Sequence, residues 1–267
     1  MSRALGLIRS EPAAQLFFTP IQKAFIKKIS GMSKQVRYFV NPYKIDNESI
    51  EYYKADLKYV CEELLPNTVE IITRAVHPES ASAEGELYVG AAGIAYAFYH
   101  VGRVLPTSLS LHYQQLAQSY LQPAMREVDR HGNNPNPGFL CGDAGVIAVG
   151  AVIAATAGLS KQAESLGKLY ADLSRICRPM GFLRAGSDEF FVGRAGYLYG
   201  ALWLNKKLEK EVVGLDIMHE LAKTIVLSGQ KYAAKNKSPC PLMYSYYGTE
   251  YLGAAHGLSS ILQVLIQ

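Results

Sequence analysis

Four short glycine-containing loops recur along the chain, and they constrain its fold more than any other sequence feature. Each loop holds two glycines that stand three or four residues apart, and an apolar run follows it. The pairs are Gly90 and Gly93, Gly142 and Gly145, Gly193 and Gly196, and Gly253 and Gly257. The second glycines are 52, 51 and 61 residues apart, so the repeating unit is longer than a tetratricopeptide repeat.

Each glycine loop is followed by an apolar helical pattern and then by an amphipathic one. The apolar patterns begin near Ile94, Ala144, Leu198 and Leu258, and the amphipathic patterns cover residues 108–128, 160–177 and 215–235. Helices that are apolar on nearly all sides are buried, whereas striped helices lie outside them. We therefore predict an all-α fold, an α/α toroid of repeated helical hairpins whose apolar helices form an inner ring.

The two glycines of each loop have separate expected roles. The first frees the backbone for a sharp turn into the inner helix, and the second lets the start of that helix pack closely against its neighbours. The helix N-termini then present unpaired N–H groups and partial positive charge at one end of the toroid. That end suits an anionic or thiolate ligand.

The distribution of charge limits the functions that the chain can have. The net charge of +4 comes from residues 1–36, which hold six Lys and Arg residues and one Glu, so the remainder is close to neutral. This distribution argues against nucleic-acid binding. We interpret residues 1–36 as an extension without a fold role; a basic surface helix with peripheral membrane contact, or a transit peptide, is the alternative. Residues 37–267 are interpreted as the folded domain.

Two further patterns concern the start of the domain and its most apolar segment. Residues 46–65 carry a helical pattern. The uncharged run from Ala144 to Ser160 is 17 residues long, shorter than the roughly 20 strongly apolar residues of a membrane-spanning helix, so a buried core helix is expected. The four cysteines are widely spaced, which favours reduced, mostly buried thiols in a cytoplasmic protein over a disulfide framework.

At its glycine loops the chain resembles the LanC-like proteins, eukaryotic relatives of the bacterial lanthionine-synthesising cyclases. The resemblance rests on Cys141–Gly145, Gly193–Leu198, Pro241–Tyr244 and Gly253–Leu258. Residues 186–193 and 244–252 most resemble the subgroup of LanC-like protein 3. The similarity covers about residues 37–267.

This resemblance implies a seven-repeat toroid with a central zinc ion held by two Cys and one His. The zinc activates a thiol, glutathione in the eukaryotic members, for addition to dehydroamino acids in peptides and proteins. Such chemistry is reasonable because zinc lowers the pKa of a bound thiol.

The sequence departs from the family at its end. The resemblance places the zinc ligands in later repeats, in a Cys-His-Gly motif that this sequence lacks. The terminal run Val264–Gln267 also lacks a helix-stop signal. We therefore interpret the chain as a truncated form with four of the seven repeats, expected to bind no zinc and to be inactive alone.

The resemblance also nominates individual residues. His256 matches the catalytic His beside the metal and is predicted to occupy the position of Ala195 one repeat earlier. Arg37 matches an Arg that contacts glutathione, and a guanidinium suits a carboxylate. Glu189 is a candidate acidic partner, although the adjacent Asp188 fits nearly as well.

Other polar residues of the loops have simpler interpretations. Asp143 and Arg194 are expected to be structural, with Asp143 a helix cap. Cys141 is expected to be a buried thiol, because no second Cys or His stands at ligand spacing.

Two alternatives to a thiol-adding enzyme remain open. One is a non-catalytic protein that binds glutathione or acts as an adaptor. The other is a six-hairpin glycosidase, which would need two inward carboxylates, and Asp143 and Glu189 are the plausible pair. Cytoplasmic location, with association at the plasma membrane through residues 1–36, completes the expectations.

Overall fold

The computed structural model describes residues 54, 56–78, 85–105 and 107–267. The chain divides into two compact units, Met1–Lys58 and Tyr59–Gln267, and the second is the larger of the two. Its elements are a π-helical turn η2 (Val60–Leu64) and the α-helices α3 (Leu65–Ala75), α4 (Ala91–Val104), α5 (Thr107–His131), α6 (Asp143–Thr156), α7 (Ser160–Cys177), α8 (Arg194–Leu208), α9 (Leu215–Asn236) and α10 (Leu258–Leu265). The all-α prediction is confirmed; the number of repeats stays a prediction.

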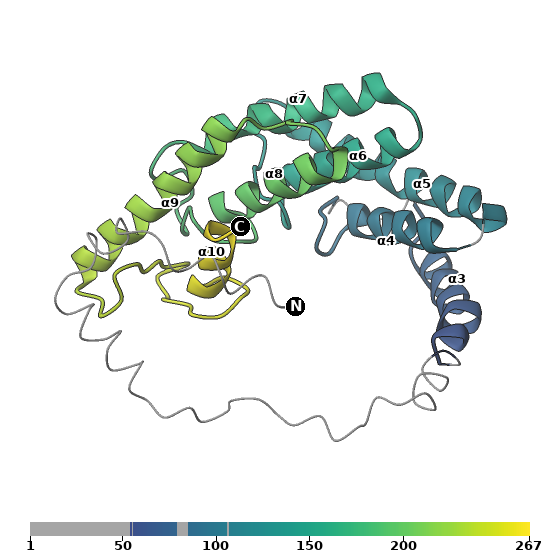
Figure 1. Cartoon of the computed structure of the whole chain (residues 1–267), viewed down its shortest axis with the longest axis horizontal. Helices are drawn as coiled ribbons and strands as arrows, with labels where there is room; N and C mark the ends of the chain where they lie inside the picture. The colour runs from purple at the N-terminus through teal and green to yellow at the C-terminus, as the bar shows by residue number, and fades with distance from the viewer. Residues whose placement is uncertain (1–53, 55, 79–84, 106) are drawn as a thin grey trace, which may run out of the picture. The chain divides into compact units, whose positions relative to one another are not determined.

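The helices from α4 onward form two layers. Within the first layer α4 contacts α6, α6 contacts α8, and α8 contacts α10. The second layer comes from the following helices, since α5 packs on α4, α7 on α6 and α9 on α8. Figure 1 shows α7 and α9 on one side of α6 and α8. Each of the first three glycine loops therefore opens a hairpin of one inner and one outer helix, and the fourth opens α10.

Burial separates the layers as the sequence pattern predicts. Every residue of α6 from Asp143 to Ala154 is buried, so the apolar run after Gly142 is a core helix. In α7 only one stripe is buried: Ala163, Leu166, Gly167, Tyr170, Leu173, Ser174 and Cys177. No helix among the residues that the structure describes is long and apolar enough to cross a membrane.

Two stacked tyrosines join the outer layer to the inner one. The rings of Tyr170 on α7 and Tyr197 on α8 lie 4.9 Å apart at 16°. Each hydroxyl donates to the main-chain carbonyl of the other residue, at 2.8 Å and 2.9 Å. Both side chains are fully buried, so this exchange satisfies two phenols that burial would otherwise leave without a partner.

The glycine loops are tied to one another at one end of the layers. The Tyr88 N–H donates to the Leu140 carbonyl, and the N–H groups of Leu140 and Cys141 donate to the Phe191 carbonyl. The second glycine lets each of these loops fold closely over the start of its own inner helix, since a Cβ on Gly145 would stand 1.8 Å from the Phe139 carbonyl oxygen of the same loop.

Two expectations about the fold need correction or fall outside the structure. Helical structure near the start of the domain continues to Ala75 and does not end at Leu65, because Pro66 sits in the first turn of α3, where its missing N–H costs nothing. Residues 1–36, and residues 46–53 and 55 of the segment 46–65, lie outside the described residues.

All four cysteines lie in the described range and are free thiols, which agrees with the expected reduced state. The expectation that they are mostly buried is wrong. Cys177 alone is buried, Cys61 is exposed, and Cys141 and Cys240 are intermediate.

Candidate functional site

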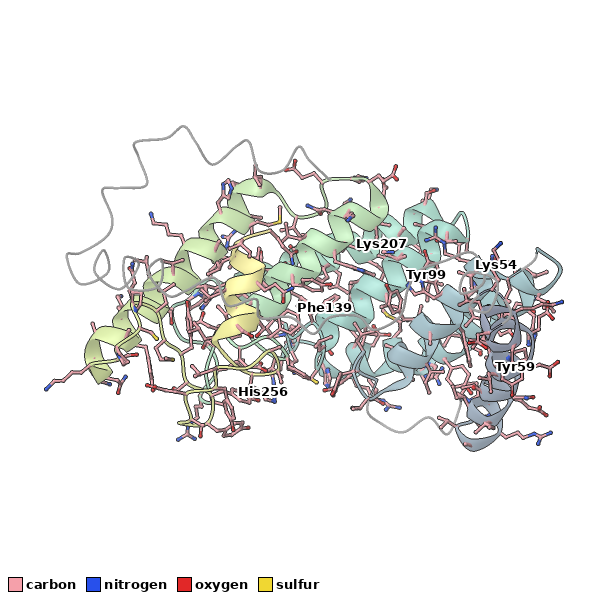
Figure 2. All side chains as sticks on the ribbon, turned by 60° about the horizontal axis from the view of Figure 1, so that its bottom comes forward. Lys54, Tyr59, Tyr99, Phe139, Lys207 and His256 are labelled. Carbon is pink, nitrogen blue, oxygen red and sulfur yellow. The ribbon has the colours of Figure 1, made fainter. Side chains whose placement is uncertain are left out.

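The candidate site is built around His256, which ends the loop before α10 (Figure 2). Its Nδ1 lies 2.5 Å from Oε1 of Glu189, a residue of the loop before α8. Glu189 is 3% exposed, and its Oε2 accepts the Val192 N–H at 2.7 Å. A carboxylate at Nδ1 fixes the orientation of an imidazole and leaves Nε2 to exchange a proton with a bound molecule. The pair is therefore equipped for proton transfer.

Aromatic rings hold the imidazole in place. Tyr246 stacks on His256 with 4.9 Å between centroids and 15° between planes. Phe191 lies 4.7 Å away and Tyr251 5.9 Å away, both tilted. The His256 side chain is still 36% exposed, so the ring is fixed but open to a ligand. Tyrosines are frequent in the segment that leads to His256, at positions 244, 246, 247 and 251.

The predicted repeat position of His256 is wrong. Gly257 is the N-cap of α10 with φ −120° and ψ −172°, which matches the N-cap Gly193 of α8 at φ −98° and ψ −171°. The first helical N–H bonds back seven residues in both loops, from Leu258 to the Tyr251 carbonyl and from Arg194 to the Ser187 carbonyl.

In the corrected register His256 therefore corresponds to Val192 and Cys141, not to Ala195. Ser260 takes the place of the second glycine. Gly253, by contrast, has no structural requirement for glycine, because an added Cβ there would meet no atom within 4 Å.

Asp188 and Arg194 form a separate buried pair. Arg194 is fully buried and donates to the Asp188 carboxylate and to the carbonyls of Cys177, Pro179 and Met180. Its cation thus lies at the C-terminal end of α7, where a helix favours positive charge. Asp188 also accepts the Ser228 hydroxyl at 2.5 Å.

Burial raises the pKa of the Asp188 carboxyl, while Arg194 and the Ser228 hydrogen bond act in the opposite direction. Arg194 is structural, as expected, and Glu189, not Asp188, is the partner of His256.

Asp143 is also structural, but the predicted cap is wrong. Gly142 is the N-cap of α6, and no side chain caps it. The Asp143 carboxylate instead lies 2.7 Å from Nδ1 of His131 and accepts the Asn136 N–H at 2.8 Å. These contacts engage both oxygens of the Asp143 carboxylate and hold it within its own loop.

Cys141 is a protonated thiol at neutral pH. Burial, the charge of Glu86, a hydrogen bond to Glu86 and the charge of Glu189 together raise the pKa of the Cys141 thiol to about 11. A thiol with this pKa is a poor nucleophile, because the thiolate is the reactive form.

Zinc does not fit the described part of the chain. Within it, no three His, Cys, Asp or Glu side chains are grouped so that they could hold a metal ion. Arg37, which the resemblance nominates for contact with glutathione, lies outside the described residues.

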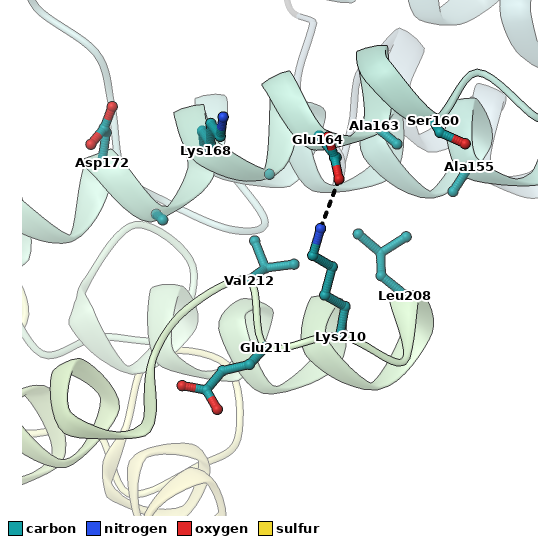
Figure 3. Close-up of a pocket in the computed structure, with 12 residues that line it drawn as sticks. Ala155, Ser160, Ala163, Glu164, Lys168, Asp172, Leu208, Lys210, Glu211 and Val212 are labelled. Atoms are coloured by element: carbon teal, nitrogen blue, oxygen red, sulfur yellow. Dashed lines mark hydrogen bonds and ion pairs between the residues drawn. The ribbon is translucent and has the colours of Figure 1, made fainter.

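Two hollows in the structure differ in size and in whether they adjoin His256. A cavity of about 130 Å³ adjoins His256 and is lined by Asp188, Glu189, Ser228, Tyr244 and Ser245, among others. It is smaller than a typical ligand site and has room for a few water molecules. A groove of about 560 Å³ between α7 and the α8–α9 connection is crossed by the ion pair of Lys210 and Glu164 (Figure 3). None of the candidate site residues lines that groove.

Comparison with known proteins identifies the family. The sequence model of the lanthionine synthetase C-like proteins matches residues 81–267. The chain belongs to this family. A zebrafish (Danio rerio) relative named glutathione S-transferase LANCL1 is 35% identical over 187 residues, which are 67% of this chain and 43% of the relative. The chain thus matches less than half the length of that LanC-like relative.

Proposed function

We propose that this LanC-like chain supplies the proton-transfer residues of a thiol-addition site, with His256 as the acid and base and Glu189 as its positioning residue. The observation that carries the proposal is the 2.5 Å contact between His256 Nδ1 and the buried Glu189 carboxylate. An imidazole held in this way at an open surface suits general acid–base catalysis, which contributes about 10²- to 10⁴-fold in rate.

The proposed reaction adds a thiol across the carbon–carbon double bond of a dehydroamino acid residue. His256 Nε2 takes the thiol proton, and the sulfur forms a bond to the β-carbon. The electron pair of the double bond moves to the α-carbon, whose carbonyl stabilises the enolate. The imidazolium then returns its proton to the α-carbon, so the product contains every atom of both reactants. Glu189 stabilises the imidazolium that exists between these two steps.

The proposed thiol is glutathione and the proposed acceptor is a peptide or protein that carries a dehydroamino acid. The name of the zebrafish relative, glutathione S-transferase, supports the thiol. A carboxylate of glutathione is proposed to pair with Arg37. We place the protein in the cytoplasm, with residues 1–36 as a basic segment able to contact the plasma membrane. Its subgroup is proposed to be that of LanC-like protein 3.

A second candidate function is binding of glutathione or of a protein partner without turnover. The family resemblance implies that the reaction depends on zinc. In the described part of the chain no three metal-binding side chains are grouped, and this favours binding without turnover. The reaction above uses only residues of this chain. We expect the purified chain to contain much less than one zinc ion per molecule.

The experiment that tests the proposal is addition of glutathione to a dehydroalanine peptide in D₂O, with the wild-type chain and with His256→Asn. Protonation by a fixed imidazole delivers deuterium to one face of the α-carbon, so wild type is expected to give an excess of one diastereomer. His256→Asn is expected to give the equal mixture of the uncatalysed reaction, at a rate about 10²-fold lower or more.

The outcomes separate the two functions. An equal mixture at the uncatalysed rate with wild-type chain contradicts proton transfer. If glutathione still binds in a titration under the same conditions, the binding role is supported instead.

A further inference from the structure

A strained turn lies directly beside His256. Tyr246 and Thr249 exchange two main-chain hydrogen bonds, at 2.9 Å and 3.0 Å. The two residues between them, Tyr247 and Gly248, have φ of +49° and +77°. Such a turn favours Asn, Asp or Gly at its first central position, and a bulky residue there strains the backbone. The chain nevertheless carries Tyr247 at this position.

Packing does not explain the tyrosine. Tyr247 is 77% exposed, so its ring gains little from burial. Its backbone N–H donates to the Ala185 carbonyl at 2.8 Å, which holds the turn against the loop that carries Glu189. Strained residues of this kind are concentrated at sites that bind ligands.

The Tyr247 ring is also one end of a continuous row of rings, which we call the aromatic strip. The strip consists of Tyr88, Phe191, His256, Tyr246 and Tyr247. Successive centroids are 4.9, 4.7, 4.9 and 4.8 Å apart. His256 is the middle ring, and the end rings Tyr88 and Tyr247 are 61% and 77% exposed.

We propose that the aromatic strip binds the acceptor peptide, with Tyr88 and Tyr247 each contacting an apolar or aromatic side chain of it while His256 faces the reacting residue. This inference rests on the proposed function and adds a substrate preference to it. His256 is the middle ring of the strip, so a molecule bound along the strip also contacts the imidazole. Because the proposed reaction brings the acceptor peptide to this imidazole, the peptide is the molecule that we expect the strip to bind.

The spacing of the rings sets the positions of the contacted side chains. Tyr247 is two ring contacts of 4.8 and 4.9 Å from His256, and Tyr88 is two contacts of 4.9 and 4.7 Å away. An extended chain rises about 3.4 Å per residue, so each end ring lies at most about three residues from the reacting one. Alternate side chains of an extended chain point to the same face, so a peptide with aromatic residues two positions from its dehydroalanine suits the strip.

The test compares two five-residue peptides with dehydroalanine at the centre, one with Phe at both ends and one with Ser at both ends. Their affinities for the full 267-residue chain are measured by calorimetric titration without added thiol. The Phe peptide is expected to bind about fivefold or more tightly, the effect of one aromatic pair. Tyr247→Asn suits the turn and is expected to reduce the preference at least twofold, and Tyr88→Asn to do the same.

Matched variants control for folding and for nonspecific stacking. Tyr247→Phe keeps the ring and is expected to keep the preference. Tyr59→Asn removes an exposed tyrosine outside the strip, 57% exposed, and is also expected to keep it. A preference that survives both Tyr247→Asn and Tyr88→Asn, or is absent in wild type, overturns this inference and leaves the proposed function standing.

Failure of the proposed function gives a different result. If wild type binds neither peptide, the peptide acceptor of the proposed function is contradicted together with the strip. A wild-type dimer in sedimentation that Tyr247→Asn dissociates would assign the strip to a second copy of the chain and overturn the inference.

Discussion

Asp188 and Glu189 are adjacent residues whose buried carboxylates serve different partners. Asp188 accepts from Arg194 and Ser228, whereas Glu189 contacts His256 and the Val192 N–H. The first carboxylate joins the loop to α8 and α9, and the second orients an open imidazole. One loop therefore combines a structural anchor with a functional group.

Replacing each carboxylate by its neutral amide should lower the free energy of unfolding by very different amounts. Asp188→Asn leaves the fully buried Arg194 without its counter-charge, so we expect it to lower the free energy of unfolding by about 3–5 kcal/mol. Glu189→Gln keeps its size and leaves only a half-exposed His256, so we expect a loss below about 2 kcal/mol. Urea denaturation of the two variants measures both. An equal or larger loss for Glu189→Gln would contradict the division of roles.

Cys141 should resist alkylation at pH 8. Its pKa of about 11 leaves about a hundredth of the thiolate of an ordinary cysteine at that pH. We expect iodoacetamide to label Cys141 about 100-fold more slowly than the exposed Cys61, as followed by peptide mass spectrometry. Glu86→Gln removes a charge that raises this pKa, so it should speed the labelling of Cys141 and leave Cys61 unchanged. If Cys141 and Cys61 of the wild type were labelled at equal rates, the raised pKa of the Cys141 thiol would be ruled out.

The same thiol has a predictable effect on stability. Its pKa of about 11 in the folded chain exceeds the usual 9.0, so the folded state holds the proton more tightly than the unfolded state. The resulting stability is fully present below pH 9 and is lost as the pH rises through 11. Cys141→Ser should flatten the decline of the unfolding free energy between these values, as measured by urea titrations. An unchanged slope would count against the raised pKa.

Two glycine substitutions test the corrected repeat register. A Cβ on Gly196 would stand 1.9 Å from the Phe190 carbonyl oxygen, whereas one on Gly253 would meet nothing within 4 Å. We expect Gly196→Ala to lower the unfolding free energy by about 3 kcal/mol or more and Gly253→Ala to change it by less than about 0.5 kcal/mol. Thermal unfolding of both variants provides the comparison. A large loss in Gly253→Ala would restore its predicted role as a structural glycine.

The layers of the fold could be predicted because the inner and outer helices differ in how many sides are apolar. The run after Gly142 has no polar face, and the structure buries every residue from Asp143 to Ala154. The register of the last loop could not be predicted in the same way. Gly253 and Gly257 look like the earlier glycine pairs in the sequence, but only the backbone conformation shows that Gly257 is the N-cap.

The candidate site was partly predictable. His256 and Glu189 could be nominated, but Asp188 and Glu189 are neighbours, and only the fold of their loop decides which carboxylate meets His256. The cap assigned to Asp143 was wrong because the loop brings His131 and Asn136 to its carboxylate, and no local pattern shows that contact. The strip of rings joins loops that are far apart in the sequence, so it could not be foreseen.

The central claim is that Glu189 fixes His256 so that Nε2 is free of a proton and able to accept one. The most direct test is the histidine side-chain ¹H–¹⁵N spectrum of the ¹⁵N-labelled chain at neutral pH, with His256→Asn for assignment. We predict that neutral His256 carries its proton on Nδ1, donated to Glu189, and that Glu189→Ala abolishes this preference. A His256 with its proton on Nε2 in the wild type, or a spectrum unchanged by Glu189→Ala, would contradict the account.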